Sequence, residues 1–573
     1  MFILGINAAF HDSAAALIRD GKILAAAEEE RFTRIKHAKR PIPFSTYELP
    51  YYAIDYCLSE AGISLADVHH VGYSFDPYLV RPDLKESQTI SLPLSPSASG
   101  ASHAWEPLFL CSIVNAPRQL SGGAPHHIEE RFRLGDSVPY QWHFLDHHLC
   151  HAASAFYPSP FDKAAVLTLD GRGELATTTY SVGEGRDLER ISQVNLPHSL
   201  GLLYEEVTRY LGFLHSSDEF KVMALASYGQ PVYVEQFRSC VRVGGQGQYS
   251  ITPLNLSEWF GPARFYGAPL ENKHFNLAHS LQVILQESVL EIAGWLHNET
   301  GCENLCIAGG VGLNCVLNNY IREQGPFEHI WVQPAAGDAG TALGAALWLD
   351  AKRGPRKMAR VPMDHAFFGP EFSDDQIEDL LISSQLYYRK PHNFTEDVAA
   401  LLANNKVIGW FEGRMEFGPR ALGARSILAS PRSQNMQQKL NRLKDREDFR
   451  PVAPVILEEE APLWFRNGKE SPFMLFVTDI LPSVEAKIPA VRHIDRTARV
   501  QTVNNDQNPL LYELLRQFYS ITGIPLLVNT SFNVASEPIV CRPADALRTF
   551  FASSLDALAI GPFILEKTEM YPE

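Results

Sequence analysis

The sequence predicts a mixed α/β protein whose first part is internally duplicated and is followed by a second α/β unit. A strand–turn–strand plan occupies residues 2–30 and begins again at Ala164, and each copy carries glycine-containing turns. Such turns expose backbone N–H groups that can hold phosphates. The charged, Gly/Pro-bearing residues 352–357 predict a linker. We expect the duplicated domain to span residues 1–355 and the second domain residues 363–573.

The two copies are expected to place their strands in the same order. Alternating and short apolar runs bounded by turn residues predict the strands of the first copy at 2–6, 14–18 and 23–27. The same criteria predict strands of the second copy at 165–169 and 177–182, with turns at 170–174 and 183–187.

Helices and further strands are expected beyond the second copy. Helical periodicity marks residues 202–228 and 277–300, and strand–turn–helix patterns occupy 304–318 and 332–349. The second unit is expected to hold strands at 407–410, 473–480 and 524–528. Residues 80–140, rich in Pro, Ser and Gly, are predicted to be an insertion or lid.

Composition narrows the function classes. The chain of 573 residues carries 50 Lys+Arg against 66 Asp+Glu, a net charge of −16, which disfavours nucleic-acid and membrane-surface partners. A hydrophobic content of 45% excludes global disorder. No signal peptide and no apolar run of about 18 residues is recognised. The eight cysteines form no C-x-x-C pair, so we expect reduced thiols and a cytoplasmic protein.

The segment Asp146–Phe156 is a candidate metal-binding helix. If it is helical, His147 and His151 lie about 40° apart, on the face opposite an apolar stripe and away from the core. This i,i+4 spacing suits a metal held between two imidazoles, whereas a His-rich surface helix is the alternative. Asp170 and Asp338 are the candidate carboxylate ligands. Two histidines with carboxylates suit iron(II), manganese or zinc.

A glycine-rich turn follows the apolar residues 305–307. In Ala308–Asn314 the glycines Gly309, Gly310 and Gly312 would let a backbone approach a nucleotide at a helix N-terminus. A purely structural turn is equally compatible with this pattern. The spacing is not G-x-G-x-x-G and no Walker A sequence occurs, which argues against a dinucleotide fold or a P-loop enzyme.

The second unit contains a local excess of positive charge. Between Arg414 and Arg450 there are nine basic and four acidic residues, a net charge of +5. A solvated basic face is the alternative, but arginines beside glycine turns favour a pocket for polyphosphate. In the first turn of the chain, His11 beside Asp12 is a candidate general base or substrate-orienting group, and a histidine that only bonds the loop is the alternative.

These motifs, in this order, resemble those of the O-carbamoyltransferases of antibiotic and nodulation-factor biosynthesis, over nearly the whole chain. The resemblance is carried by residues 10–16 (FHDSAAA), 28–34 (EEERFTR), 147–151 (HHLCH), 308–314 (AGGVGLN), 418–423 (GPRALG), 444–446 (KDR) and 529–533 (NTSFN). It implies an actin-like ATPase (ASKHA-type) N-terminal domain, akin to threonylcarbamoyl-transferring enzymes of tRNA modification, and a YrdC-like C-terminal domain.

The resemblance also implies an ATP-dependent reaction in two steps. The C-terminal domain would make carbamoyl adenylate from ATP and carbamoyl phosphate, and the N-terminal domain would pass the carbamoyl group to a hydroxyl of a small-molecule natural product. The implied catalytic residues are His11, Lys444, Arg446 and Ser531. The implied metal ligands are His147, His151, Asp170 and Asp338. Substrate and nucleotide contacts are expected from Asp12, Gly171, Gly309, Gly310, Gly312, Asn314, Arg420, Arg450, Arg499 and Asn533.

The cofactors and partners follow from the same resemblance. Fe²⁺ is expected at the His/Asp site, with Mn²⁺ or Zn²⁺ as alternatives, and Mg²⁺ is expected with ATP. The partners are ATP, carbamoyl phosphate and the hydroxyl acceptor, with no nucleic acid and no membrane; a homo-oligomer is left open. Residues 80–140 and 230–275 match no motif and are where acceptor specificity is expected.

Three other functions are compatible with parts of the sequence. A tRNA-modifying or hydrogenase-maturation carbamoyltransferase is the nearest, although the latter type carries an acylphosphatase domain and paired C-x-x-C zinc fingers, which this sequence lacks. A nucleotide-gated scaffold without transfer chemistry would not need Lys444, Ser531 and the two metal histidines. A carbohydrate kinase would leave the second domain without a purpose.

Overall fold

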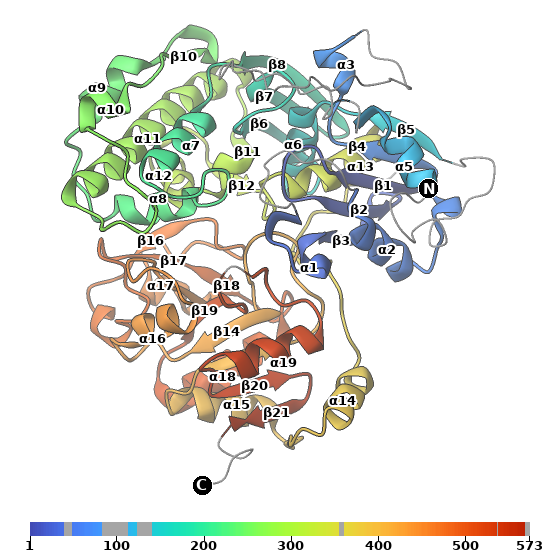
Figure 1. Ribbon diagram of the computed structural model, residues 1–573, viewed down its shortest axis with the longest axis vertical. Helices are drawn as coiled ribbons and strands as arrows, with labels where there is room; N and C mark the ends of the chain where they lie inside the picture. The colour runs from blue at the N-terminus through green and yellow to red at the C-terminus, as the bar shows by residue number, and fades with distance from the viewer. Residues whose placement is uncertain are drawn as a thin grey trace.

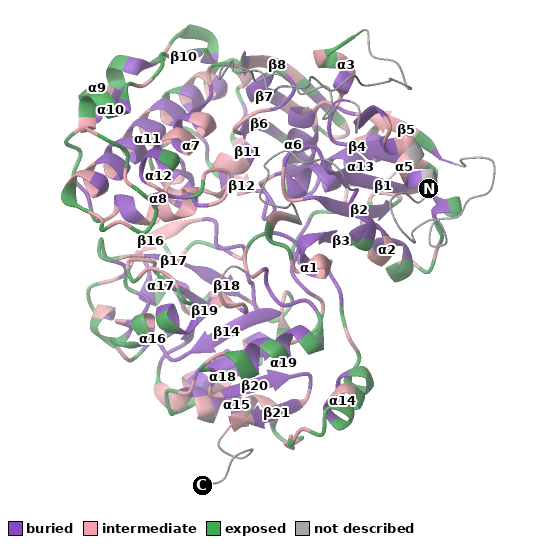
Figure 2. Cartoon of the chain, in the orientation of Figure 1, coloured by how far each residue is buried: buried purple, intermediate pink, exposed green. Residues whose placement is uncertain are grey.

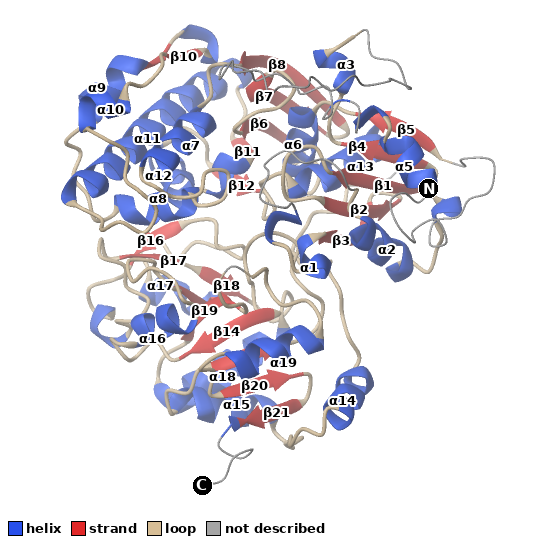
Figure 3. Cartoon of the chain, in the orientation of Figure 1, coloured by secondary structure: helices blue, strands red, loops and turns tan. Residues whose placement is uncertain are grey.

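A computed structural model describes residues 1–38, 49–82, 110, 113–122, 140–354, 360–535 and 537–567. The N-terminal part forms a larger unit, coloured blue to yellow-green, and the C-terminal part forms a smaller unit, coloured yellow to red (Figure 1). Both units mix helices and strands (Figure 3), which confirms the predicted mixed α/β class. Among the residues described, no helix is both long and apolar enough to cross a membrane.

The first sheet of the larger unit has five strands in the order β3-β2-β1-β4-β5. Three antiparallel strands come first: β1 (Phe2–Asn7), β2 (Ala14–Arg19) and β3 (Lys22–Glu28). Two parallel strands complete it: β4 (His70–Tyr73) beside β1, and β5 (Gln141–Phe144) beside β4. Its short helices are α1 (Glu30–Thr33), α2 (Tyr51–Glu60), α3 (Pro77–Val80) and α5 (Ala116–Gly122).

The second sheet repeats this plan, with the order β12-β11-β6-β7-β8. The antiparallel strands are β6 (Lys163–Leu169), β7 (Ala176–Glu184) and β8 (Asp187–Asn195). The parallel strands are β11 (Asn304–Ala308) beside β6 and β12 (His329–Val332) beside β11. Read from the other edge, the pairing matches that of the first sheet strand for strand, so the predicted duplication is confirmed.

Two helices, α6 (His147–Phe156) and α13 (Ala339–Arg353), pack against each other between the sheets. Glycine makes their close approach possible. A Cβ on Gly344 would lie 1.8 Å from the carbonyl oxygen of Cys150, and a Cβ on Gly5 would lie 1.8 Å from that of Ala342. The small residues of α13 therefore bring the start of α13 next to the start of α6, where the candidate metal ligands lie.

A helical region extends the second half. Its elements are α7 (Leu200–Tyr210), α8 (Glu219–Ala226), α9 (Val234–Cys240), α10 (Leu256–Phe260), α11 (Asn272–Thr300), α12 (Cys315–Gln324) and the hairpin of β9 (Val241–Val243) and β10 (Tyr249–Ile251). The single helix expected at 202–228 is two helices, because the chain turns between α7 and α8. Helix α11 ends at Gly301, whose φ of 60° makes a left-handed cap.

The smaller unit is built on a seven-stranded mixed sheet. In spatial order its strands are β18 (Gln501–Val503), β15 (Ala453–Leu457), β19 (Leu526–Ser531), β14 (Arg425–Ala429), β13 (Ile408–Phe411), β20 (Ala557–Ile560) and β21 (Phe563–Glu566). Its helices are α14 (Asp374–Ser383), α15 (Phe394–Ala403), α16 (Met436–Leu443), α17 (Ala461–Trp464), α18 (Pro509–Thr522) and α19 (Pro543–Ala552).

Two predicted boundaries differ from the structure. The strand expected at 473–480 is only β16 (Val477–Asp479), which pairs with β17 (Thr497–Arg499). Residues 473–475 are apolar because they pack into the core of the larger unit, not because they belong to a sheet. Helix α13 continues to Arg353 and so includes the first two residues of the expected linker. Residues 355–359, and most of the insertion expected at 80–140, lie outside the described residues.

The segment after β3 joins the two units. Arg31 is only 3% exposed and donates from Nη2 to the carbonyl oxygen of Gly418 at 3.0 Å. The Gly418 N–H in turn donates to Glu28 Oε1 at 2.9 Å. Arg34 donates to the carbonyl oxygen of Pro538 at 2.7 Å. These hydrogen bonds hold loops of the smaller unit against the segment that follows the first sheet's β3. Buried residues are present in both units (Figure 2).

Candidate active site

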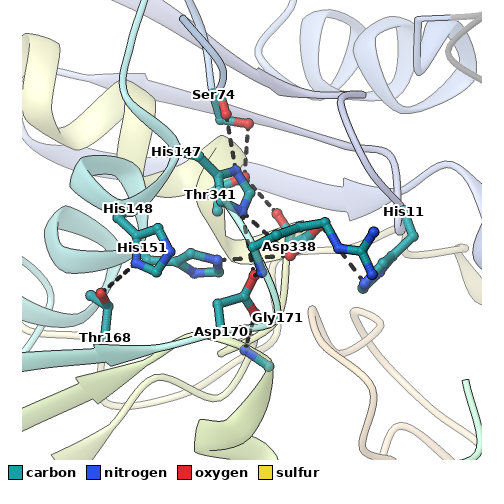
Figure 4. Close-up of polar contacts among 12 residues, drawn as sticks. His11, Ser74, His147, His148, His151, Thr168, Asp170, Gly171, Asp338 and Thr341 are labelled. Carbon is teal, nitrogen blue, oxygen red and sulfur yellow. Dashed lines mark hydrogen bonds and ion pairs between the residues drawn. The ribbon is translucent and has the colours of Figure 1, made fainter. Parts of the chain in front are cut away.

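Two imidazoles and two carboxylates meet where the halves of the larger unit touch. We call His147, His151, Asp170 and Asp338 the His/Asp quartet; one ligand atom of each lies within 4.8 Å of the others. His147 Nε2 is 3.8 Å from Asp170 Oδ2 and 3.6 Å from Asp338 Oδ1. His151 Nε2 is 3.7 Å from the same Asp338 oxygen. The four side chains point toward one another in Figure 4.

Local hydrogen bonds set the direction of His147. Asp146 caps α6 by accepting the Leu149 N–H at 2.7 Å, and Glu174 accepts the His147 N–H at 3.1 Å. His147 Nδ1 is 3.1 Å from the carbonyl oxygen of Ser74, which can only accept. The Nδ1 atom therefore carries the proton, and the lone pair on Nε2 faces the two carboxylates.

The surroundings of α6 differ from the sequence prediction. The histidine face was expected to point away from the core, but the side chains of His147, His148 and His151 are all fully buried. Helix α13 covers that face, whereas Leu149 of the predicted apolar stripe stays partly exposed. His148 on the flank hydrogen-bonds Thr168 through Nδ1 at 2.7 Å. The alternative of a His-rich surface helix is thereby excluded.

The quartet fits a divalent cation. Among the described residues, no hydrogen-bond partner is found for four buried atoms: His147 Nε2, both ring nitrogens of His151, and Asp338 Oδ1. Unpartnered buried polar atoms are destabilising, by about 1–3 kcal/mol each, unless a ligand satisfies them. Burial and the charge of Asp338 oppose ionisation of Asp170, but the two imidazoles outweigh them and lower its pKa to about 2. Both imidazole and ionised carboxylate are ligands of iron(II), manganese and zinc.

His11 lies at the edge of the quartet, with Nε2 3.8 Å from Asp338 Oδ2. Its Nδ1 is 2.9 Å from Asp12 Oδ2, and the other oxygen of Asp12 is 2.7 Å from Nδ1 of His37. Burial alone would raise the pKa of Asp12, but the two imidazoles hold it well below its ordinary value. The carboxylate of Asp12 thus orients two imidazoles at once.

The glycine turns divide into two groups. Gly171 and Gly310 line the central cavity, and the Gly310 N–H donates to Asp170 Oδ1 at 2.7 Å. Gly309 has a φ of 93°, and a Cβ there would lie 2.1 Å from the carbonyl oxygen of Leu169, so it serves the close packing of the turn. A Cβ on Gly312 would lie 3.3 Å from side-chain carbons of Ala336 and Ile307, so this glycine also serves close packing. Of the three glycines in 308–314, Gly310 is therefore the one that faces the cavity.

Asn314, expected to contact a nucleotide, has a structural role as well. Its side chain accepts the Leu317 N–H at 2.9 Å and so caps α12, and its Nδ2 donates to Gln282 at 2.9 Å. The residue also lines the cavity.

In the smaller unit, Lys444 sits against the end of β19. Its Nζ donates to the backbone carbonyl of Ser531, to Ser531 Oγ at 3.1 Å and to Asn533 Oδ1 at 2.7 Å. Burial, and then the charges of Arg446 and Arg450, hold the pKa of Lys444 well below its ordinary value. The structure thus brings together the two short motifs that the sequence analysis paired.

Three further arginines, Arg420, Arg450 and Arg499, extend this positive charge. We call the five residues Arg420, Lys444, Arg446, Arg450 and Arg499 the cationic cluster. Burial, and then Arg499 and Arg450, lower the pKa of Arg420 to about 9. Burial and the same two arginines lower that of Arg446 to about 9. Within the part of the chain that the structure describes, Arg420 Nε, Arg446 Nη2 and Arg499 Nε are buried and have no hydrogen-bond partner. An anion with several oxygens would satisfy these groups.

One cavity of about 430 Å³ connects the quartet with the cationic cluster. From the larger unit it is lined by His11, Asp12, Asp170, Gly171, Gly310, Asn314 and Asp338, and from the smaller unit by Arg420, Arg446, Arg450, Arg499, Ser531 and Asn533. Lys444, His147, His151, Gly309 and Gly312 are predicted residues that lie behind this lining.

The sequence analysis missed several residues of the site. His37 and Ser217 line the cavity and hydrogen-bond each other, Nε2 to Oγ, at 2.8 Å. Glu28 and Arg31, which join the units, also line it. The segment 28–34 was recognised as a motif but received no role, because its partners in the smaller unit are 387 to 505 residues away. The available signal was the run of three glutamates at 28–30 directly before Arg31.

The chain matches two family models. Residues 2–82 and 130–347 match the model described as carbamoyltransferase N-terminus, and residues 399–567 match carbamoyltransferase C-terminus. An uncharacterised protein of Synechocystis sp. is 41% identical over 99% of this chain and 97% of that protein. Nodulation protein NolNO of Sinorhizobium fredii is 37% identical over 99% of this chain and 80% of that protein.

A further relative and a solved structure are similar at lower identity. Nodulation protein U of Rhizobium fredii is 30% identical over 91% of this chain and 88% of that protein. The crystal structure of HypF from T. kodakarensis aligns with a TM-score of 0.32 at 12% identity, covering 61% of this chain and 47% of that one.

Proposed function

Because the chain belongs to the carbamoyltransferase family and is a transferase, we propose that it works in two steps, by making carbamoyl adenylate and then carbamoylating a hydroxyl of a small molecule. Carbamoyl phosphate and ATP are the proposed co-substrates. The proposal assigns the first step to the cationic cluster and the second to the His/Asp quartet with His11.

In the first step, water cleaves carbamoyl phosphate to carbamate and phosphate. A carbamate oxygen then attacks the α-phosphorus of ATP, the bond to the β-phosphate breaks, and pyrophosphate leaves with the electron pair. Bringing these anions together is electrostatically unfavourable. The buried cations Lys444, Arg446 and Arg420 would offset that repulsion and stabilise the charge that develops on the leaving pyrophosphate.

In the second step, the acceptor oxygen attacks the carbamoyl carbon, AMP leaves, and the acceptor proton is released to a base. His147, His151, Asp170 and Asp338 would hold the metal ion, which when bound supplies Lewis-acid polarisation of an oxygen ligand. His11 is exposed to the cavity beside Asp338. We assign it contact with the carbamoyl group, which it would orient for attack.

The observation that carries the proposal is the continuity of the cavity between the two clusters. Carbamoyl adenylate is a mixed anhydride that water hydrolyses readily, so forming and using it within one cavity would shorten its exposure to water. A cation site and an anion site within one cavity of about 430 Å³ are what this sequence of reactions requires.

Incubation of the protein with ATP, carbamoyl phosphate and a panel of hydroxylated metabolites tests the proposal. We expect pyrophosphate release that depends on carbamoyl phosphate, and a product heavier by one carbamoyl group by mass spectrometry. ATP that stays intact in the presence of carbamoyl phosphate would contradict the adenylate step. Metal analysis of the purified protein tests the quartet, for which we propose iron(II), with manganese or zinc as alternatives, while Mg²⁺ accompanies ATP.

A further inference from the structure

Beside the quartet, a second set of polar residues connects the two halves of the larger unit. Asp12 follows β1, His37 follows α1, and Ser217 precedes α8. All three line the cavity. Asp12 Oδ1 lies 2.7 Å from His37 Nδ1, and His37 Nε2 lies 2.8 Å from Ser217 Oγ. A carboxylate, an imidazole and a hydroxyl thus form one hydrogen-bonded line.

We propose that His37 is the general base that takes the proton of the acceptor's hydroxyl, that Asp12 orients it, and that Ser217 lies beside the bound hydroxyl. The proposal rests on the proposed transfer reaction and adds to it the destination of the acceptor's proton. His37 is then a catalytic residue, and Asp12 and Ser217 are positioning residues.

The hydrogen bonds assign the proton on His37. Because an ionised carboxylate only accepts, Nδ1 of His37 donates to Asp12 and the lone pair of the ring is on Nε2. That lone pair faces a hydroxyl, that of Ser217, and the cavity beyond it. Nucleophile activation by a base that a third group orients has this geometry on unrelated folds.

The two imidazoles that hydrogen-bond Asp12, those of His11 and His37, face different groups. His11 Nε2 is directed at Asp338 in the quartet, whereas His37 Nε2 is directed at a hydroxyl. One carboxylate therefore serves one imidazole beside the carbamoyl group and one beside a hydroxyl. This division matches a reaction between a carbamoyl group and an alcohol.

Asp12 and His37 lie close enough to Glu30 for the three to hold a metal ion, but their ligand atoms are already engaged in hydrogen bonds. Both oxygens of Asp12 and both ring nitrogens of His37 already have hydrogen-bond partners. In the quartet, by contrast, His147 Nε2 and His151 Nε2 have none. Moreover, Asp12 and His37 adopt left-handed backbone conformations, with φ of 51° and 61°. Strained backbone of this kind clusters at functional sites, where surrounding contacts enforce it.

The reaction balances with these groups. The acceptor's O–H bond breaks as its proton moves to His37 Nε2, and the oxygen forms a bond to the carbamoyl carbon. The bond between that carbon and the adenylate oxygen breaks, and AMP leaves with the electron pair. The imidazolium of His37, stabilised by Asp12, then releases its proton to water.

Ser217 offers a test that needs neither ATP nor an acceptor. If His37 acts as a base on a hydroxyl at this position, Ser217 should react with diisopropyl fluorophosphate, forming a phosphorus–oxygen bond while fluoride leaves and His37 takes the proton. Peptide mass spectrometry locates the label. His37→Gln should slow the labelling about 10²-fold, because an amide can keep the hydrogen bonds but accepts no proton.

His215→Gln is the matched control. His215 lies in the same loop and pairs with a carboxylate, Glu205, at 3.1 Å, but it does not line the cavity. We expect the labelling rate of Ser217 to stay at the wild-type value in this variant. Labelling of Ser217 at equal rates in the wild type and in His37→Gln would overturn the proposal, as would a wild-type Ser217 that does not react.

A second measurement examines transfer itself. With ATP and carbamoyl phosphate present, hydroxylamine is a nucleophile that needs no base, and glycerol is a hydroxyl that does. We expect His37→Gln to keep hydroxyurea formation near the wild-type rate while carbamoyl glycerol falls about 10²-fold. An unchanged ratio of the two products would contradict the role of His37. If the wild type itself formed no hydroxyurea, that result would instead contradict the adenylate step of the proposed function.

Discussion

The His/Asp quartet and the cationic cluster lie at the two ends of one cavity, and each contains buried polar atoms that find no hydrogen-bond partner among the described residues. The quartet presents ionised carboxylates and unpartnered imidazole nitrogens, whereas the cluster presents buried guanidinium groups with unpartnered N–H atoms. One end therefore fits a cation and the other a polyanion. Because each of the two proposed steps depends on a different ligand, we expect that each step can be removed without the other.

The largest expected effect is that of Lys444→Ala. Lys444 donates to Ser531 and Asn533 at the end of β19, and its charge would offset that of the substrates. We expect pyrophosphate release that depends on carbamoyl phosphate to fall about 10³-fold. Lys439→Ala is the control, because Lys439 lies on α16 but pairs with Asp556 at 2.9 Å outside the cavity. Equal pyrophosphate release by the two variants would contradict the assignment of the first step to the cationic cluster.

A comparable loss at the other end should leave the first step intact. His151→Ala removes one imidazole from the quartet, so we expect bound metal to disappear and carbamoyl transfer to fall about 10²-fold. Pyrophosphate release should stay within about threefold of the wild type. Metal analysis and the two partial reactions measure this directly. His70→Ala, at the start of β4 where His70 contacts His143 of β5, is the matched histidine control.

His11→Asn addresses the group between the quartet and the cavity. Asparagine can keep a hydrogen bond to Asp12 but has no imidazole Nε2 beside Asp338. We expect transfer to fall about 10²-fold while pyrophosphate release and metal content remain. If metal is lost as well, His11 serves the quartet and not the carbamoyl group.

Much of this site could be predicted because its signals are local in the sequence. The spacing of His147 and His151 follows from helical geometry, and the duplicated strands follow from turns whose residues are adjacent. The motifs around Lys444 and Ser531 are each short runs of adjacent residues, so they can also be recognised in the sequence. Asp170 and Asp338 were candidates because each stands in a glycine-containing turn, and the resemblance to a family implied the same two ligands. Only the tertiary contacts place them beside the histidines.

Other features could not be read from local patterns. The histidine face of α6 looked solvent-exposed because nothing in its own segment indicates that α13 covers it. The apolar residues 473–475 suggested a strand, but they are buried by contact between the units. His37 and Ser217 are 180 residues apart, and neither stands in a pattern with a known chemical meaning. In each case the information lies in packing between distant segments, which periodicity does not report.

The smallest expected effect is on thermal stability, and it tests the comparison most directly. A ligand at 100 times its Kd stabilises the folded state by about 2.7 kcal/mol, which corresponds to a shift of a few degrees in Tm. We expect the metal ion to raise the Tm of Lys444→Ala but not of His151→Ala. We expect ATP with Mg²⁺ to raise the Tm of His151→Ala but not of Lys444→Ala. If ATP protects neither variant, the nucleotide needs both ends of the cavity, and the two sites are not independent.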